Sequence, residues 1–164
     1  MEILTRAVGL VGNINNVTIL HNAVSSTSDE IVRLFLSEDA SGNHSQFLGD
    51  TGRSENVATL SLDDFVLRFD AEEIAVIKMD IEGAEFLAIE GGKRLLKQKR
   101  PVMVVEFNRE AARNAGWRLE SLYEMLCQIG YRAYWLRDGG IQPFALVEMD
   151  TENFSDNLIF RCDL

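Results

Sequence analysis

Apolar and polar positions alternate along the first seventy residues in patterns that predict short elements. Residues 3–11 carry apolar side chains at helical spacing, which predicts a helix. Apolar runs predict strands at residues 17–20 and 31–36. Residues 37–56 are rich in Ser, Gly, Asn and Asp and predict a long exposed loop, and loops of this length are often functional. An amphipathic helix is predicted over residues 60–69.

The centre of the chain predicts two buried strands, each ending at a carboxylate. Residues 74–79 are almost continuously apolar and lead to Asp80, a pattern typical of a strand buried on both faces of a parallel sheet. A glycine turn follows, and then a helix with an apolar face over residues 84–95. The second buried strand is predicted at residues 102–105, and Glu106 ends it.

The last third of the chain continues this alternation of helices and strands. A helix is predicted over residues 119–129, followed by strands at 131–136, 144–147 and 158–161. Strands that alternate with helices predict an α/β fold with right-handed crossovers. Neither a linker nor an internal repeat divides the chain, so residues 1–164 are predicted to form a single domain.

Composition excludes several classes of function. The chain has 16 Lys and Arg against 26 Asp and Glu, a formal net charge of −10, which disfavours nucleic acid and anionic membranes as partners. No apolar run approaches the roughly 18 residues that a membrane span needs. The only cysteines, Cys127 and Cys162, are far apart and predict neither a disulfide framework nor a metal site.

Four polar side chains follow the two central strands. Asp80 and Glu106 end the strands, and Glu82 and Asn108 lie two residues beyond each of them. In an open parallel sheet, ligands bind beyond the carboxyl ends of the strands, and neighbouring strands lie about 4.8 Å apart. We therefore expect these groups to converge on one rim. Their chemistry is compatible with a divalent-metal site, an acid–base pair or a rim that recognises hydroxyl groups.

The run Ile77-Lys78-Met79-Asp80-Ile81-Glu82-Gly83-Ala84-Glu85 closely resembles a motif of the FkbM family of S-adenosylmethionine-dependent methyltransferases. In that family the motif ends the fourth strand of the Rossmann-like class I methyltransferase fold. Other family elements resemble residues 16–25, 59–64, 100–106 and 129–131. The resemblance therefore implies transfer of a methyl group from S-adenosylmethionine to a small-molecule acceptor, chiefly to a hydroxyl of a small molecule or a sugar.

The resemblance also implies roles for individual residues. Asn22, Ala23 and Val24 would lie near the adenine of the cofactor. Asp80 would contact the cofactor as well, and Asp80, Glu82 and Glu106 would be the catalytic groups. Glu106 and Asn108 would face the acceptor. His44, in the predicted loop, is a further candidate on the acceptor side, and the alternative is an exposed histidine without a role.

One element of the family motif set does not occur in these 164 residues. The cofactor loop Asp-x-Gly-Ala-Asn-x-Gly has no counterpart, so we expect an incomplete fold that lacks the first two family strands and corresponds to the C-terminal portion of the domain. In the family strand order 3-2-1-4-5-7-6, this leaves the strand at 74–79 with an exposed apolar edge. We expect weak cofactor binding by the chain alone, and a homodimer or pairing with an N-terminal half.

Two alternatives to a methyltransferase stay open at this point. The first is a degenerate, non-catalytic domain that serves as a binding or regulatory partner. The second is a small acidic enzyme that uses Asp80, Glu82 and Glu106 to hold a divalent metal.

Overall fold

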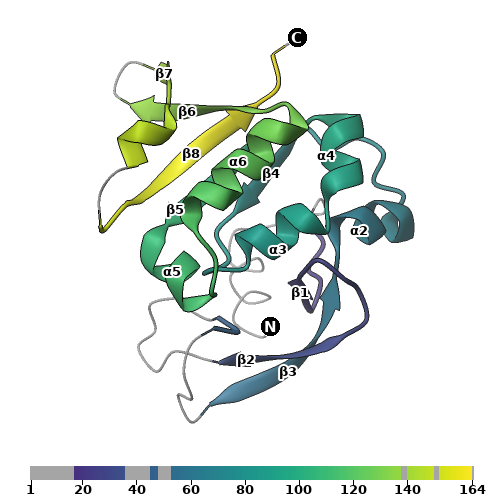
Figure 1. The fold of residues 1–164 in the computed structure, drawn as a ribbon. Helices are drawn as coiled ribbons and strands as arrows, with labels where there is room; N and C mark the ends of the chain where they lie inside the picture. The colour runs from purple at the N-terminus through teal and green to yellow at the C-terminus, as the bar shows by residue number, and fades with distance from the viewer. Residues whose placement is uncertain (1–16, 36–44, 48–52, 138–139, 150–151, 164) are drawn as a thin grey trace.

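The computed structural model describes residues 17–35, 45–47, 53–137, 140–149 and 152–163. These residues form a five-stranded sheet, a three-stranded sheet and a set of helices (Figure 1). The protein is therefore a mixed α/β protein, as the sequence predicts.

The five-stranded sheet has the strand order β4-β5-β8-β6-β7. β4 and β5 are parallel, whereas the other three neighbouring pairs are antiparallel. The predicted strand at 144–147 is wrong, because residues 140–143 pair with β6 instead and a 3₁₀ turn follows them. The strands are β4 (Val76–Met79), β5 (Val102–Asn108), β6 (Arg132–Arg137), β7 (Gly140–Pro143) and β8 (Ser155–Arg161).

The three-stranded sheet has the order β1-β3-β2 and comes from the first third of the chain. Its strands are β1 (Asn22–Val24), β2 (Ile31–Phe35) and β3 (Ser54–Leu60). β1 runs parallel to β3, and β2 runs antiparallel to it. Two predictions are wrong here. Residues 17–20 are not a strand, because the residues that pair with β3 are 22–24, and the end of the predicted loop belongs to β3.

Within the part of the chain that the structure describes, five α-helices and one 3₁₀ helix connect the strands. They are α2 (Leu62–Phe69), α3 (Glu85–Glu90), α4 (Lys93–Lys99), α5 (Arg109–Asn114), α6 (Leu119–Ile129) and η1 (Leu146–Met149). The predicted helix at 119–129 is confirmed, and α5 was not predicted. The predicted helix at 84–95 is divided at Gly91, where a Cβ atom would collide with the carbonyl oxygen of Ser25. The predicted helix at 3–11 lies outside the described residues.

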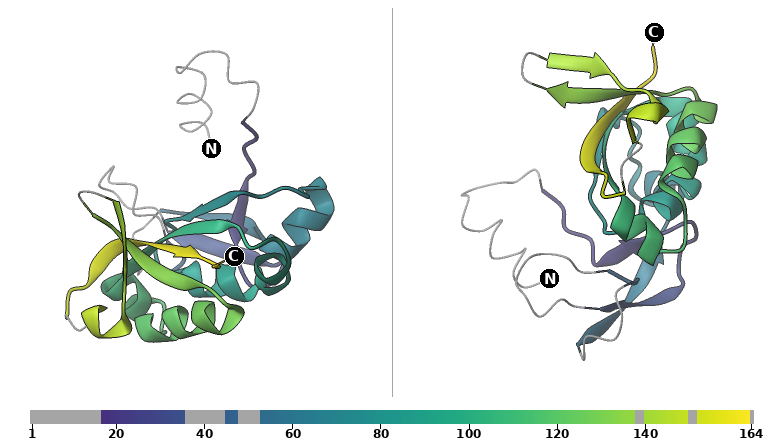
Figure 2. Two further views of the ribbon diagram at one scale, coloured as in Figure 1. Left: turned by 90° about the horizontal axis from the view of Figure 1, so that it is seen from above. Right: turned by 60° about the vertical axis from the view of Figure 1, so that its left-hand side comes forward.

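The hydrophobic core lies between the five-stranded sheet and the helices α3, α4, α5 and α6, which lie on one side of it (Figures 1 and 2). Side chains alternate along β5, so every second one is fully buried against the helices. Leu122 and Leu126 of α6 are also fully buried. The largest fully buried apolar side chains of the sheet are Met103, Val105, Phe107, Leu158 and Phe160.

β4 is not buried on both faces, contrary to the sequence prediction. It pairs only with β5 among the described strands, so its other edge is free of a described neighbour. Val76 is 60% exposed, and only Met79 of this strand is buried. The expected exposed apolar edge is therefore present. Among the described helices, none is long and apolar enough to cross a membrane.

Candidate functional site: an acidic cluster at the ends of two parallel strands

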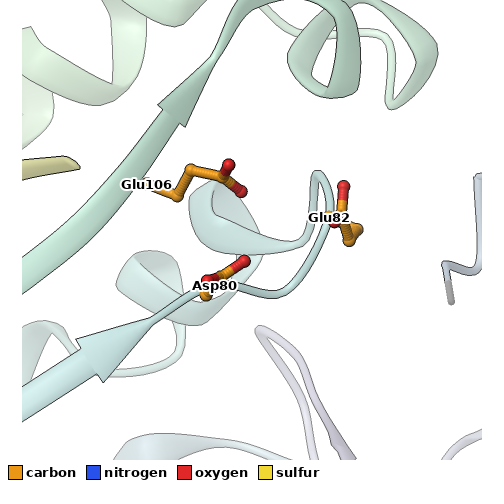
Figure 3. Close-up of side chains that lie close together, drawn as sticks. All are labelled: Asp80, Glu82 and Glu106. Atoms are coloured by element: carbon orange, nitrogen blue, oxygen red, sulfur yellow. The ribbon is translucent and has the colours of Figure 1, made fainter. Parts of the chain in front are cut away.

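Three carboxylates converge just beyond the last residue pair of the β4–β5 ladder (Figure 3). The prediction that the second strand ends at Glu106 is wrong, because β5 continues to Asn108 by pairing with β8. The parallel register pairs Met79 with Val105, so the next residues along the two strands are Asp80 and Glu106. Glu82 approaches them from the turn that follows β4. Oxygen atoms of the three carboxylates all lie within 4.8 Å of one another. We call Asp80, Glu82 and Glu106 the carboxylate cluster, and its formation confirms that these groups share one rim.

Burial and like charges raise the pKa of Glu106 to about 7. Removal from water is the largest cause, followed by the charges of Asp80 and Glu82. Among the described residues, no hydrogen-bond donor reaches the buried Oε2 atom of Glu106. A proton held by Glu106 would be donated to Asp80, and this hydrogen bond also favours the protonated form. Near neutral pH the cluster is therefore poised to bind or release one proton.

Two further charged side chains affect the cluster, Glu82 within it and Lys78 beside it. Burial and the charge of Asp80 raise the pKa of Glu82. Lys78 forms an ion pair with Asp80, with its Nζ 3.0 Å from Oδ2 of that carboxylate. Both partners of this ion pair are about half exposed, so it neutralises the cluster only in part.

The acidic turn, which we define as Ile81–Gly83, carries Glu82 into the cluster. Gly83 has a φ of 100° and is enclosed, since a Cβ atom there would lie 2.9 Å from the carbonyl oxygen of Ala111. Both features require glycine at this position. The buried side chain of Glu85 accepts hydrogen bonds from the backbone N–H groups of Ile81 and Gly83, at 2.9 and 3.0 Å. Burial raises the pKa of Glu85, although these bonds oppose the shift.

Two cavities meet at the acidic turn. A cavity of about 240 Å³ is lined by all three residues of β1, and Asp80 and Glu82 lie on its wall. A smaller cavity of about 150 Å³ lies on the other side of Glu82 and is lined by polar side chains of α5 and by Asn108. Ser45 lines both cavities. The fold thus brings Asn22, Ala23 and Val24 to the same cavity as Asp80.

Of the predicted acceptor-side residues, Asn108 does not join the cluster. The side-chain oxygen of Asn108 caps α5, where it accepts hydrogen bonds from the N–H groups of Glu110 and Ala111 at 3.0 and 3.1 Å. Asn108 also lines the small cavity, but its side-chain oxygen is engaged in capping α5. His44 lies outside the described residues.

Sequence reasoning missed two residues that contact the acidic turn. The hydroxyl of Ser45 donates to the carbonyl oxygen of Glu82 at 2.6 Å, and Nε1 of Trp117 donates to that of Gly83 at 2.8 Å. No local pattern marks either residue, because Ser45 lies in a polar segment and Trp117 in a connection between two helices.

The cluster has two chemical capabilities. Its hard oxygen atoms are of the type that divalent cations prefer, at a spacing that one ion can bridge. The same net negative charge would attract an organic cation, and Glu106 would accept a proton from a bound hydroxyl group. Exposed acidic groups also occur without an ion, so the geometry by itself does not select a metal.

The fold and the cluster together define an α/β protein with an acidic site at the ends of its parallel strands. A family model described as the methyltransferase FkbM domain matches residues 1–133. The chain therefore belongs to the FkbM methyltransferase family. No curated protein and no solved structure matches the chain in the corresponding comparisons.

Proposed function

We propose that this protein transfers a methyl group from S-adenosylmethionine to a hydroxyl group of a small molecule or a sugar. The observation that carries the proposal is the carboxylate cluster, which adjoins the cavity lined by β1. The chain that carries this cluster belongs to a methyltransferase family. A negatively charged wall suits a cationic methyl donor, because the sulfonium charge is attracted to it. When bound, S-adenosylmethionine supplies an electrophilic methyl carbon.

The residues of the chain would bind the donor, orient the acceptor and remove its proton. Asn22, Ala23 and Val24 of β1 would line the donor side of the larger cavity, with Asp80 on its wall. Glu106 would take the proton from the acceptor hydroxyl, since a pKa of about 7 suits a general base at neutral pH. Asp80 and Glu82 would orient the acceptor, a role in which alignment contributes much of the rate.

We also propose that the five-stranded sheet is one half of the class I methyltransferase fold. The support is the order β4-β5-β8-β6, in which an antiparallel strand lies between β5 and β6, as in the family order 4-5-7-6. The chain has no Asp-x-Gly-Ala-Asn-x-Gly run, so its own donor contacts would be limited to β1 and Asp80. We therefore expect weak donor binding by the isolated chain, and calorimetry with S-adenosylmethionine tests this. A micromolar dissociation constant would contradict it.

The direct test is a methylation assay with the protein as it is purified from its natural source, together with any chain that remains bound. Formation of S-adenosylhomocysteine is measured after addition of S-adenosylmethionine and each of a panel of hydroxyl-bearing small molecules and sugars. Asp80→Asn should lower the rate by about 10²-fold, because a group that orients the acceptor loses its charge. Asp70→Asn is the matched control, because Asp70 is exposed and caps α2, away from the cluster. No turnover with any acceptor, or equal rates for wild type and Asp80→Asn, would contradict the proposal.

The exposed edge of β4 supports a second candidate function. Next to this edge lies an apolar groove of about 630 Å³, which is lined by residues 74–78, by Asn22 and Val24 of β1, and by Leu60. An unpaired edge beside an apolar groove is a pairing surface for another strand. The alternative is therefore a non-catalytic methyltransferase-like domain that binds a second copy of itself or a cofactor-binding half supplied by another polypeptide.

Sedimentation of the purified protein distinguishes the two functions. A stable complex that Val76→Lys disrupts, without any effect of S-adenosylmethionine on thermal unfolding, would favour the binding function. Val76 is the suitable position because its side chain is 60% exposed on the edge strand, so lysine should not disturb the core. Ile31→Lys is the control, since Ile31 is 67% exposed on β2 and does not line the groove.

A further inference from the structure

The acidic turn has an uncommon backbone conformation. Glu82 has a φ of 51° and Gly83 a φ of 100°, so two successive residues lie in the left-handed region. Glycine adopts this region freely, but a residue with a side chain reaches it only at a cost in free energy. Such residues persist where the surrounding structure holds them, and they occur frequently at functional sites. Contacts from outside the turn are therefore needed to hold Glu82 in this conformation.

Glu85 binds the N–H groups of the turn. Its two carboxylate oxygens accept from Ile81 at 2.9 Å and from Gly83 at 3.0 Å, so the side chain reaches back from α3 over both ends of the turn. Glu85 is only 3% exposed. Burial of a carboxylate is costly unless hydrogen bonds satisfy it, so these bonds explain why a charged residue is accepted at this position.

Two side chains distant in the sequence bind the carbonyl groups of the same turn. Ser45 donates to the carbonyl of Glu82 at 2.6 Å, across 37 positions of the chain. Its oxygen also accepts the N–H of Phe47 at 3.1 Å, which fixes the hydroxyl. Trp117 donates to the carbonyl of Gly83 at 2.8 Å, across 34 positions. Side chains from three separate segments therefore bind the N–H and C=O groups of three consecutive residues.

We propose that Ser45, Glu85 and Trp117 are positioning residues that hold the acidic turn in its left-handed conformation and thereby keep Glu82 in the carboxylate cluster. This inference rests on the proposed function, because the cluster matters for catalysis only if it is the acceptor site. The three residues act through the backbone of the turn. Loss of any one anchor allows the backbone of Glu82 to relax to a negative φ, which turns its side chain away from the other carboxylates.

Two uncharged substitutions test the proposal without altering the charge of the site. Trp117→Phe removes the indole N–H but keeps a ring that stacks on Phe86, and Ser45→Ala removes only the hydroxyl. Hydrogen exchange of the Ile81 and Gly83 amides is measured by NMR. Neither substitution removes a partner of these amides, yet both should speed their exchange about tenfold if the turn is held as one unit.

The matched control is Trp135→Phe. It removes the same kind of indole N–H, which in the wild type lies 3.4 Å from Glu148 and away from the acidic turn. Exchange of the turn amides should be unchanged in this variant. The ¹³Cα chemical shift of Glu82 supplies a second readout, since it reports the backbone conformation. It should move away from its wild-type value in Trp117→Phe and Ser45→Ala. Wild-type exchange and a wild-type Glu82 shift in both variants would overturn the proposal.

Methyl transfer supplies the functional readout and separates this proposal from the preceding one. With the native protein, Trp117→Phe and Ser45→Ala should lower kcat by about 10²-fold with little change in KM for the donor, because the reacting groups are misaligned rather than lost. Wild-type kcat in both variants would overturn the positioning role even if the turn loosens. The NMR measurements need neither donor nor acceptor, so absence of methyl transfer in the wild type contradicts only the proposed function.

Discussion

Glu106→Gln should make the protein more stable at pH 8 and change its stability little at pH 4.5. Glutamine has nearly the shape of glutamic acid but carries no charge at any pH. In the wild type, burial and the charges of Asp80 and Glu82 disfavour the ionised form of Glu106 and raise its pKa from 4.5 to about 7. The substitution removes the ionisation and with it the repulsion.

The sign and the magnitude follow from this shift. The folded state holds the proton more tightly than the unfolded state, so the wild type loses stability as the pH rises from about 4.5 to about 7. At 1.36 kcal/mol per pH unit, the difference corresponds to about 3 kcal/mol without screening. Glu106 is only partly buried and Asp80 is exposed, so solvent reduces the expected effect to about 1–2 kcal/mol.

Urea unfolding followed by tryptophan fluorescence, at several pH values between 4.5 and 8, measures the free energy of unfolding of each variant. The wild type should lose about 1–2 kcal/mol more than Glu106→Gln between pH 4.5 and pH 8. Glu124→Gln on the exposed face of α6 is the control, and it should follow the wild type across the range. If wild type and Glu106→Gln show the same pH dependence, the reasoning about the carboxylate cluster is wrong.

Three further predictions concern the carboxylate cluster, the acidic turn and the start of α4. Asp80→Asn should lower the pKa of Glu106 from about 7, because after burial the charge of Asp80 contributes most to the shift. ¹³C NMR of the glutamate carboxyl groups measures this, and an unchanged value would contradict the contribution assigned to Asp80. Gly83→Ala should destabilise the protein by about 2–4 kcal/mol in urea unfolding, because φ is positive and the new Cβ would lie 2.9 Å from the Ala111 carbonyl. Gly130→Ala is the control and should cost less, because Gly130 also has a positive φ but no atom lies within 4 Å of the position that its Cβ would take. Asp63→Ala should cost about 1–2 kcal/mol, because its carboxylate accepts two backbone N–H groups at the start of α4, at 3.2 and 2.8 Å; a midpoint of thermal unfolding equal to that of the wild type would contradict this.

The central strands and their carboxylates could be predicted from the sequence because the information is local. A run of apolar residues that stops before Asp80, and a second that stops before Glu106, indicate two parallel strands whose carboxylates lie at one edge, although β5 itself continues to Asn108. The bounds of α6 followed from its helical spacing of apolar residues and from Gly130 at its end. These patterns, with the run from Ile77 to Glu85, were sufficient to place the chain in its family.

Elements that depend on distant partners could not be predicted in this way. β3 begins with Ser, Glu and Asn, which resemble the preceding loop, and these residues belong to the strand because β2 pairs with them. The helix after β4 is interrupted at Gly91, whose carbonyl accepts the N–H of Asp63 from a distant segment and whose Cα leaves no room for a side chain beside the carbonyl of Ser25. The exposed edge of β4 was expected, but its exposed face was not, because the helices pack on one side of the sheet (Figure 1) and no run of apolar residues specifies that side.

The sequence by itself thus determined which carboxylates follow the two central apolar runs, because the end of such a run and its polar residue are set by neighbouring positions. Only the tertiary structure decided how Glu82 joins them. Its place depends on Ser45, 37 positions away, and on the indole of Trp117 bound to the next carbonyl. Hydrogen bonds of this kind form only when folding brings distant segments together, so no local pattern records them.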